Sequence, residues 1–139
     1  MITLPPPDPA TLARRAEIAS ALKAIVPDGV IGDEASLTAF DCDALTAYRQ
    51  RPLLCVLPVS ADQVSAVLAY AARENVRIVP RGAGTSLSGG ALPLADGILL
   101  GLSRMSRILE LDYENRCAVV QPGVTNASVT RAVQGRGFY

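Results

Sequence analysis

Residues 80–90, Pro-Arg-Gly-Ala-Gly-Thr-Ser-Leu-Ser-Gly-Gly, concentrate four glycines and three hydroxyl side chains in eleven positions. Glycine adopts positive φ angles and lets a ligand reach the main chain, because it has no Cβ atom. Successive N–H groups in such turns converge on an anion, and Thr85, Ser86 and Ser88 add hydroxyl donors. Arg81 offers a positive charge beside them. This segment, called the glycine loop below, is therefore suited to binding a diphosphate.

Two better-known phosphate loops do not fit the spacing of these residues. A P-loop ends in Gly-Lys-Ser/Thr, but the only lysine of the chain is Lys23, far from the glycine loop. The dinucleotide fingerprint Gly-x-Gly-x-x-Gly has Gly82 and Gly84 here, but Leu87 stands at its third position. A strand-like segment follows the loop, so a helix N-terminus is not the expected source of anion binding. From the residues alone, a flexible surface loop without a ligand stays open as an alternative.

The chain contains no histidine, which removes the usual general base, zinc ligand and activator of a nucleophile. Cys42, Cys55 and Cys117 are widely spaced, and we expect three buried thiols in a reducing compartment. Asp41 and Asp43 have no partner at metal-ligand spacing, so a solvated turn is the better interpretation. The sequence predicts no catalytic residue and no metal site.

Composition limits the class of protein. The 139 residues are half hydrophobic, enough for one domain with a core. The 13 basic and 13 acidic side chains balance, so neither nucleic acid nor an anionic membrane surface is an expected partner. No apolar run approaches the roughly 20 residues that span a bilayer, and the first residues carry no export signal. We expect a soluble, cytoplasmic chain with no transmembrane segment.

Several elements must position the glycine loop. Asp8 before Pro9 predicts the start of a helix over about residues 10–25, and a second helix is expected around residues 34–40. The apolar run 53–57 between prolines is typical of a buried strand. Ser60 and Gln63 form a capping box, each side chain satisfying the other residue's N–H, for a helix that ends near Asn75.

A second short strand, Arg77–Pro80, follows that helix and leads into the glycine loop. Strand, helix and strand at this spacing predict a βαβ unit with two parallel strands. Further strands are expected at residues 97–102, 108–111 and 117–121. Thr125 is expected to cap a last helix that carries Val129 and Val133.

The glycine loop closely resembles the pyrophosphate loop of FAD domains of the vanillyl-alcohol oxidase / p-cresol methylhydroxylase type. Flanking segments extend the likeness: Tyr48-Arg49 before Pro52, the run 53–58, Ser60–Gln63 and residues 120–124. Together they resemble the flavoprotein subunit of glycolate oxidase and its relatives, the D-lactate and D-2-hydroxyglutarate dehydrogenases. The resemblance covers about residues 30 to 139.

The resemblance implies an α+β fold: the N-terminal, βαβ-containing part of a two-subdomain FAD-binding domain, with mixed small sheets and flanking helices. Residues 1–50 would be an N-terminal helical extension, and residues 51–139 the N-terminal part of a truncated FAD-binding domain. The implied cofactor-binding residues come from the loop and from a second family element near residue 123. They are Pro80, Arg81, Gly82, Ala83, Gly84, Thr85, Ser86, Gly89, Gly90, Pro122, Gly123 and Val124.

For Pro122-Gly123-Val124, a plain strand-to-helix turn stays an alternative. Tyr48 and Arg49 could approach the flavin, but a packed aromatic beside a surface arginine is the preferred interpretation. Thr85 stands near the place where some relatives attach the flavin through a histidine, so FAD is expected to bind non-covalently.

The resemblance also implies a flavin-dependent oxidoreductase that oxidises a small 2-hydroxy acid such as glycolate or D-lactate. The substrate-binding part would lie beyond residue 139, so this chain alone is expected to be inactive. An electron-accepting partner subunit is a further expectation. A non-catalytic module that binds a nucleotide or phosphate is the alternative function.

Overall fold

A four-stranded sheet is the centre of the computed structural model, which describes residues 3–139. The strand order is β1 (Val30–Ile31), β2 (Leu54–Val56), β4 (Gly97–Gly101) and β3 (Arg77–Arg81). β4 runs parallel to β2 and to β3, whereas β1 is antiparallel to β2. This mixed sheet, its flanking helices and a separate small hairpin confirm the predicted α+β class.

The predicted βαβ unit forms, with α4 (Ala61–Glu74) between two strands that point the same way. However, β2 and β3 are not neighbours, because β4 lies between them. β4 suits this central place because all five of its residues are buried. Its final glycine also allows close packing, since a Cβ at Gly101 would lie 2.6 Å from Leu57 Cδ2. β1 was not predicted, because two residues carry too little periodicity to indicate a strand.

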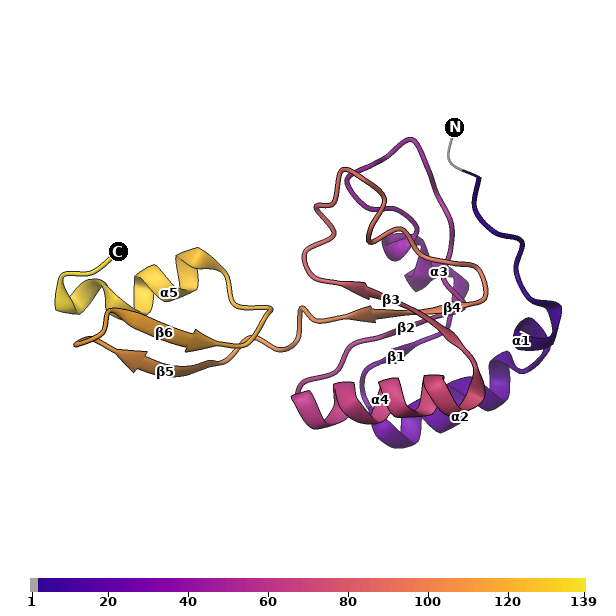
Figure 1. Cartoon of the computed structure of the whole chain (residues 1–139), viewed down its shortest axis with the longest axis horizontal. Coiled ribbons are helices and arrows are strands. Elements are labelled where there is room, and N and C mark those ends of the chain that lie inside the picture. The colour runs from indigo at the N-terminus through magenta and orange to yellow at the C-terminus, as the bar shows by residue number, and fades with distance from the viewer. Residues whose placement is uncertain (1–2) are drawn as a thin grey trace.

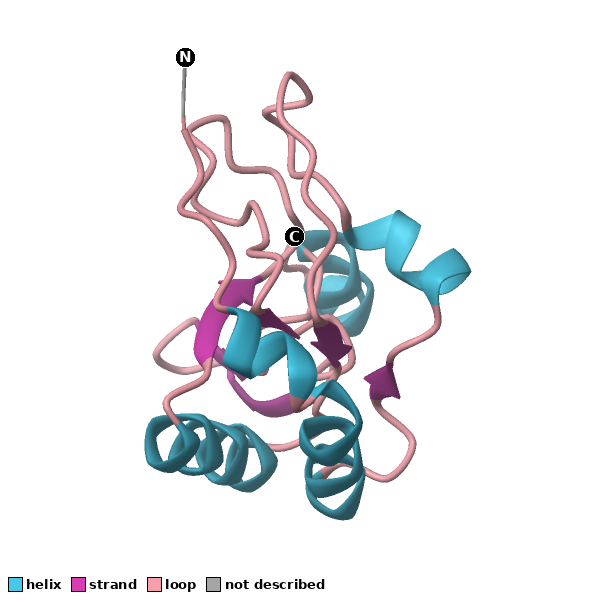
Figure 2. Ribbon diagram, turned by 90° about the vertical axis from the view of Figure 1, so that its right-hand side faces the viewer, coloured by secondary structure: helices cyan, strands magenta, loops and turns pink. Residues whose placement is uncertain are grey.

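The two faces of the sheet take alternate residues of each strand, as the pleat requires. Leu54 and Val56 of β2 share one core cluster with buried residues of α2 and α4, whereas Cys55 joins Leu37 and Leu99 in another. Figures 1 and 2 show α2 and α4 together on one side of the sheet, with the long loops on the other. Both faces of β2 are buried, which explains its continuous apolar run.

The first predicted helix is divided into α1 (Pro9–Ala13) and α2 (Arg15–Ile25). Asp8 caps α1 as expected, accepting hydrogen bonds from two amides of the first turn. The break lies at Arg14, which has non-helical torsions and binds Glu17 and Glu74 through its guanidinium. This ion-pair network fixes the start of α2 against the end of α4.

The remaining helices within residues 3–105 lie close to their predicted positions. α3 (Glu34–Leu37) continues as the 3₁₀ turn η1 (Thr38–Phe40). At the start of α4, the Gln63 amide donates to Ser60 Oγ at 3.2 Å. The Gln63 side chain, however, accepts from the Val59 amide at 2.8 Å and not from Ser60, so half of the predicted capping box is wrong.

The last quarter of the chain forms a small separate unit, set apart from the rest in Figure 1. β5 (Ile108–Asp112) and β6 (Cys117–Val120) make an antiparallel hairpin. α5 (Asn126–Val133), capped by Thr125 as predicted, and the 3₁₀ turn η2 (Gln134–Arg136) follow it. Residues 106–139 are called the C-terminal unit below, and residues 3–105 the body.

The predicted division of the chain at residue 50 stays a prediction. Ile18, Leu22 and Val26 of the first fifty residues lie in the same core cluster as β2 and α4. The N-terminal helices therefore complete the core under the sheet that carries the glycine loop.

Candidate functional site

The glycine loop leaves the end of β3 and returns to the start of β4. None of the amides of residues 82–87 donates a hydrogen bond to any other group within residues 3–139. Gly84 has φ +74° and Gly89 has φ +75°, torsions that glycine adopts without strain. Six consecutive free N–H groups on an exposed turn are the donor set that an anion needs.

Ser86 closes the second half of the loop. Its Oγ accepts hydrogen bonds from the amides of Ser88 at 3.4 Å and Gly90 at 3.1 Å. The Leu92 amide then donates to the Gly89 carbonyl at 3.1 Å. The loop is thus divided into an open part, residues 82–87, whose amides are free, and a closed part, residues 88–90, in which the amides of Ser88 and Gly90 are bound.

Arg81 does not extend into solvent as a free charge, contrary to the expectation. Its side chain is buried and folds back beneath Gly84, with Arg81 Cδ 3.6 Å from where a Cβ of Gly84 would lie. One terminal nitrogen of the guanidinium donates to the Ala91 carbonyl at 2.6 Å. The buried Nε atom has no partner within residues 3–139. Arg81 therefore supports the loop from inside.

The two aspartates before the loop behave differently from each other. Asp41 accepts from Arg49 at 2.8 Å in an ion pair whose arginine is exposed. The prediction of a solvated turn is wrong for Asp43, which is only 5% exposed and accepts hydrogen bonds from the amides of Leu45 and Ala91. Two main-chain donors satisfy this carboxylate, which explains how it is buried without a cation.

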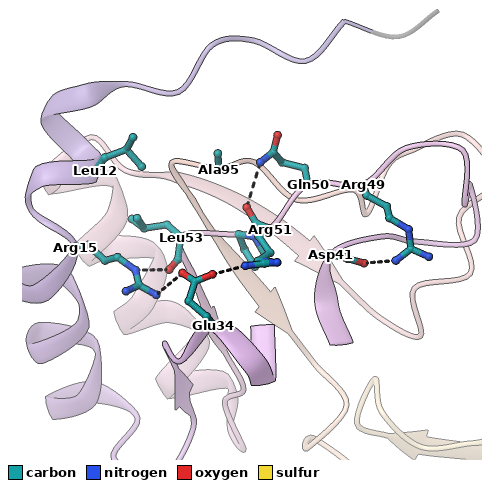
Figure 3. Close-up of a pocket in the computed structure, with 10 residues that line it drawn as sticks. Leu12, Arg15, Glu34, Asp41, Arg49, Gln50, Arg51, Leu53 and Ala95 are labelled. Atoms are coloured by element: carbon teal, nitrogen blue, oxygen red, sulfur yellow. Dashed lines mark hydrogen bonds and ion pairs between the residues drawn. The ribbon is translucent and has the colours of Figure 1, made fainter. Parts of the chain in front are cut away.

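A cavity of about 550 Å³ lies near the starts of β2 and β4, and Figure 3 shows the side chains that line it. Its charged groups are all partnered. Arg15 donates to the carbonyl oxygens of Leu53 and Gly32, and Glu34 lies between Arg15 and Arg51. Each of the three arginines that line this cavity is thus already bound to a carboxylate or to carbonyl oxygens, unlike the free amides of the glycine loop. Arg49, as preferred from the sequence, is a surface arginine.

Pro122-Gly123-Val124 turns the chain at the junction between the C-terminal unit and the body. The Gly123 amide donates to the Met105 carbonyl at 2.8 Å, and the Val124 amide donates to the Gln121 carbonyl at 3.0 Å. A Cβ at position 123 would lie 2.7 Å from the Ser103 carbonyl oxygen, so the close approach requires glycine. Neither amide is free, so this turn contributes packing and no donor.

The turn and the start of the glycine loop both lie next to Leu102, just beyond the end of β4. Leu102, which follows β4 and touches the Gly123 turn, donates its amide to the Arg81 carbonyl at 2.9 Å. Gln121 fixes the arrangement from the other side. Its side chain accepts from the Arg107 amide at 2.9 Å and donates to the Val59 carbonyl at 3.4 Å. The structure therefore brings together two segments that the sequence had grouped only by resemblance.

Residues 52–139, well over half of the chain, match the family described as "FAD binding domain". The chain belongs to this FAD-binding family. FAD is therefore the cofactor, and a dinucleotide with a diphosphate is consistent with the free amides of the glycine loop.

Relatives of this FAD-binding domain include the glycolate oxidase subunit GlcD of Escherichia coli K12, 44% identical over 126 residues. That match covers 90% of this chain and 25% of the relative. The D-2-hydroxyglutarate dehydrogenase of Stutzerimonas stutzeri is 34% identical over 119 residues, covering 85% of this chain and 26% of the relative. The chain spans about a quarter of the length of the curated relatives it matches.

A solved structure of 4-ethylphenol oxidase from Gulosibacter chungangensis, in complex with isoeugenol, has the same fold. The TM-score is 0.78 at 27% identity, over 97% of this chain and 27% of that one. The described residues thus share their fold with about a quarter of that chain, as the resemblance implied.

Other side chains of this FAD-binding domain add little chemistry. Burial raises the pKa of the Cys55 thiol to about 12, so this group stays protonated at neutral pH. Cys42 is half-buried and Cys117 is exposed, so the prediction of three buried thiols holds only for Cys55. Across residues 3–139, no three acidic, cysteine or histidine side chains are placed to hold a metal ion. No helix in the same range has the length and hydrophobicity that crossing a membrane requires.

Asp43 and Gln121 are the residues of the site region that the sequence analysis did not identify. Asp43 is linked to a residue 48 positions later, and no local pattern could indicate that pairing. Gln121 was included only as part of a strand. Its side chain donates to the carbonyl of Val59, which lies 62 positions earlier in the sequence, so no local pattern indicates this contact.

Proposed function

We propose that the open part of the glycine loop holds the FAD diphosphate in a flavin-dependent oxidoreductase that oxidises a small 2-hydroxy acid such as glycolate or D-lactate. The observation that carries the proposal is the run of free amides over residues 82–87. A diphosphate is a strong hydrogen-bond acceptor, and backbone donors fixed in advance bind it without a further ordering cost. The relatives' names support the class of substrate.

The contribution of each residue follows from its place. Gly82, Ala83, Gly84, Thr85 and Ser86 offer main-chain amides, and Thr85 adds an exposed hydroxyl. Gly89 and Gly90 belong to the closed part that shapes the loop, together with Pro80 before it. Arg81 acts through its buried charge beneath the loop. Pro122, Gly123 and Val124 form a turn beyond the end of β4, where Gly123 packs closely against residues 102–105.

FAD, when bound, supplies the redox chemistry, while the protein positions it and excludes competing reactions. Without a histidine in the chain, the glycine loop offers no histidine for covalent attachment of the flavin, so we propose non-covalent binding. The substrate and an electron-accepting partner would be bound by parts of the protein outside these residues. We therefore expect the 139-residue chain alone to show no turnover of glycolate or D-lactate.

Gly82→Ala tests the proposed diphosphate site directly. A Cβ at position 82 meets no atom within 4 Å, so the variant should fold with unchanged stability. The added methyl group would, however, stand where the ligand must approach the main chain. We expect FAD affinity, measured by quenching of flavin fluorescence, to fall by roughly tenfold or more, because forced overpacking costs ~1–3 kcal/mol.

Gly135→Ala is the matched control, since its Cβ also enters open space but lies in the C-terminal unit after α5. Unchanged FAD affinity in Gly82→Ala would contradict the proposed site. Binding of ADP with the same affinity as FAD, and without any flavin recovered with the protein, would instead favour the non-catalytic nucleotide module.

A further inference from the structure

Contacts from three residues hold the glycine loop at Gly84 and at Ala91. The three residues are Asp43, Ala44 and Arg81. The Ala44 amide donates to the Gly84 carbonyl at 2.9 Å, in the open part of the loop. The Asp43 carboxylate accepts from the Ala91 amide at 3.3 Å, just beyond the loop's end. Arg81 donates to the carbonyl of the same Ala91. These contacts are called the loop clamp below.

The clamp decides which way the free amides point. In a trans peptide, the carbonyl of one residue and the N–H of the next point in opposite directions. The Gly84 carbonyl is directed at Ala44, so the Thr85 N–H must point away from the segment that carries Asp43. The Ala44 contact therefore leaves the Thr85 amide for a ligand, and it blocks the opposite orientation of that peptide.

Burial restricts the movement of the Asp43 carboxylate within the loop clamp. Asp43 is 5% exposed, and a buried charge is tolerated only when its hydrogen-bonding capacity is largely met. One oxygen of Asp43 binds the Leu45 amide at 3.0 Å and the other binds Ala91, so the carboxylate ties both segments together. Asp43 cannot leave its position without exposing or orphaning these groups.

We propose that Asp43 is a positioning residue for the cofactor's diphosphate. It acts from outside the glycine loop, by fixing residues 43–45 so that Ala44 orients the Gly84–Thr85 peptide. It does not touch FAD itself. The proposal rests on the function proposed above, and it assigns a binding role to a segment that precedes the loop by almost forty residues.

The test compares Asp43→Ala and Asp43→Asn with Asp41→Ala. Asp41 is two positions away and makes an ion pair with an exposed arginine, so it is a matched acidic control. We expect Asp43→Ala to weaken FAD binding by roughly tenfold, because buried amides lose their acceptor. Asp43→Asn keeps one carbonyl acceptor and should recover part of the affinity, and Asp41→Ala should bind like the original chain.

A second control separates positioning from general stability. Val67→Ala removes buried volume from α4, on the side of the sheet away from the loops, and should lower the thermal midpoint without changing FAD affinity in the folded protein. NMR spectra should show shifts of the Thr85 and Ala91 amides in Asp43→Ala and not in Val67→Ala.

Equal FAD affinity in Asp43→Ala and the original chain would overturn the inference, as would an equal loss in Val67→Ala. A failure of the original chain to bind FAD would overturn the proposed function itself, and the inference with it. The variants thus test the inference about Asp43, whereas the original chain tests the proposed function.

Discussion

The body and the C-terminal unit differ in how they bury their apolar side chains. In the body, helices and strands share core clusters in which Ile18, Leu22 and Ile98 are fully buried. In the C-terminal unit, Leu109 and Val119 are 57% and 50% exposed, and all four residues of β6 are exposed. The body has a complete hydrophobic core, and it carries the glycine loop. The C-terminal unit is a hairpin and a helix that leave several large apolar side chains exposed.

Replacing a leucine by alanine should affect the free energy of unfolding much more in the body than in the C-terminal unit. Leu22→Ala removes a fully buried side chain, and we expect the free energy of unfolding to fall by ~2–5 kcal/mol. Leu109→Ala removes an exposed side chain of β5 and should change it by less than about 0.5 kcal/mol. Urea denaturation followed by circular dichroism measures both, and similar losses would show that Leu109 is buried in solution.

Gly123→Ala tests the junction between the two regions. The new Cβ would lie within 3 Å of three carbonyl oxygens in residues 102–105, so the turn must move. We expect a loss of ~1–3 kcal/mol in the free energy of unfolding, as for other overpacked sites. Gly135→Ala, where a Cβ meets nothing within 4 Å, is the control. If Gly123→Ala is as stable as this control, the packing of the turn against residues 102–105 is incorrect.

The cysteines give the mildest comparison, because they report on the two regions without perturbing them. Cys117 of the C-terminal unit is exposed and should react with a thiol reagent at neutral pH, whereas buried Cys55 should react only after unfolding. The pKa of Cys55 is raised to about 12, above its ordinary value. The stability that this difference in pKa contributes to the folded state is therefore fully present at neutral pH. It is lost as the pH rises from about 9 to about 12. Mass spectrometry of alkylated peptides measures the labelling, and early labelling of Cys55 would contradict the burial of β2.

Most local features could be predicted from the sequence because nearby residues determine them. Asp8, Ser60 and Thr125 cap their helices through contacts within a few residues, and a continuous apolar run marks the buried strand β2. The break at Arg14 was missed, since its torsions accompany an ion pair with Glu74, sixty positions later. The insertion of β4 between β2 and β3 was missed for a similar reason, because strand order is a property of the whole sheet.

The amino-acid sequence alone predicts the glycine loop, its place after a strand and its suitability for a diphosphate, because glycine torsions and hydroxyl donors are properties of the residues. Which groups remain available to the ligand depends on the folded structure. It turned the Arg81 side chain inward, buried Asp43 and directed the Gly84 carbonyl towards Ala44. The burial of Asp43 and the direction of the Gly84 carbonyl depend on contacts between segments some forty residues apart, and such contacts exist only once the chain has folded.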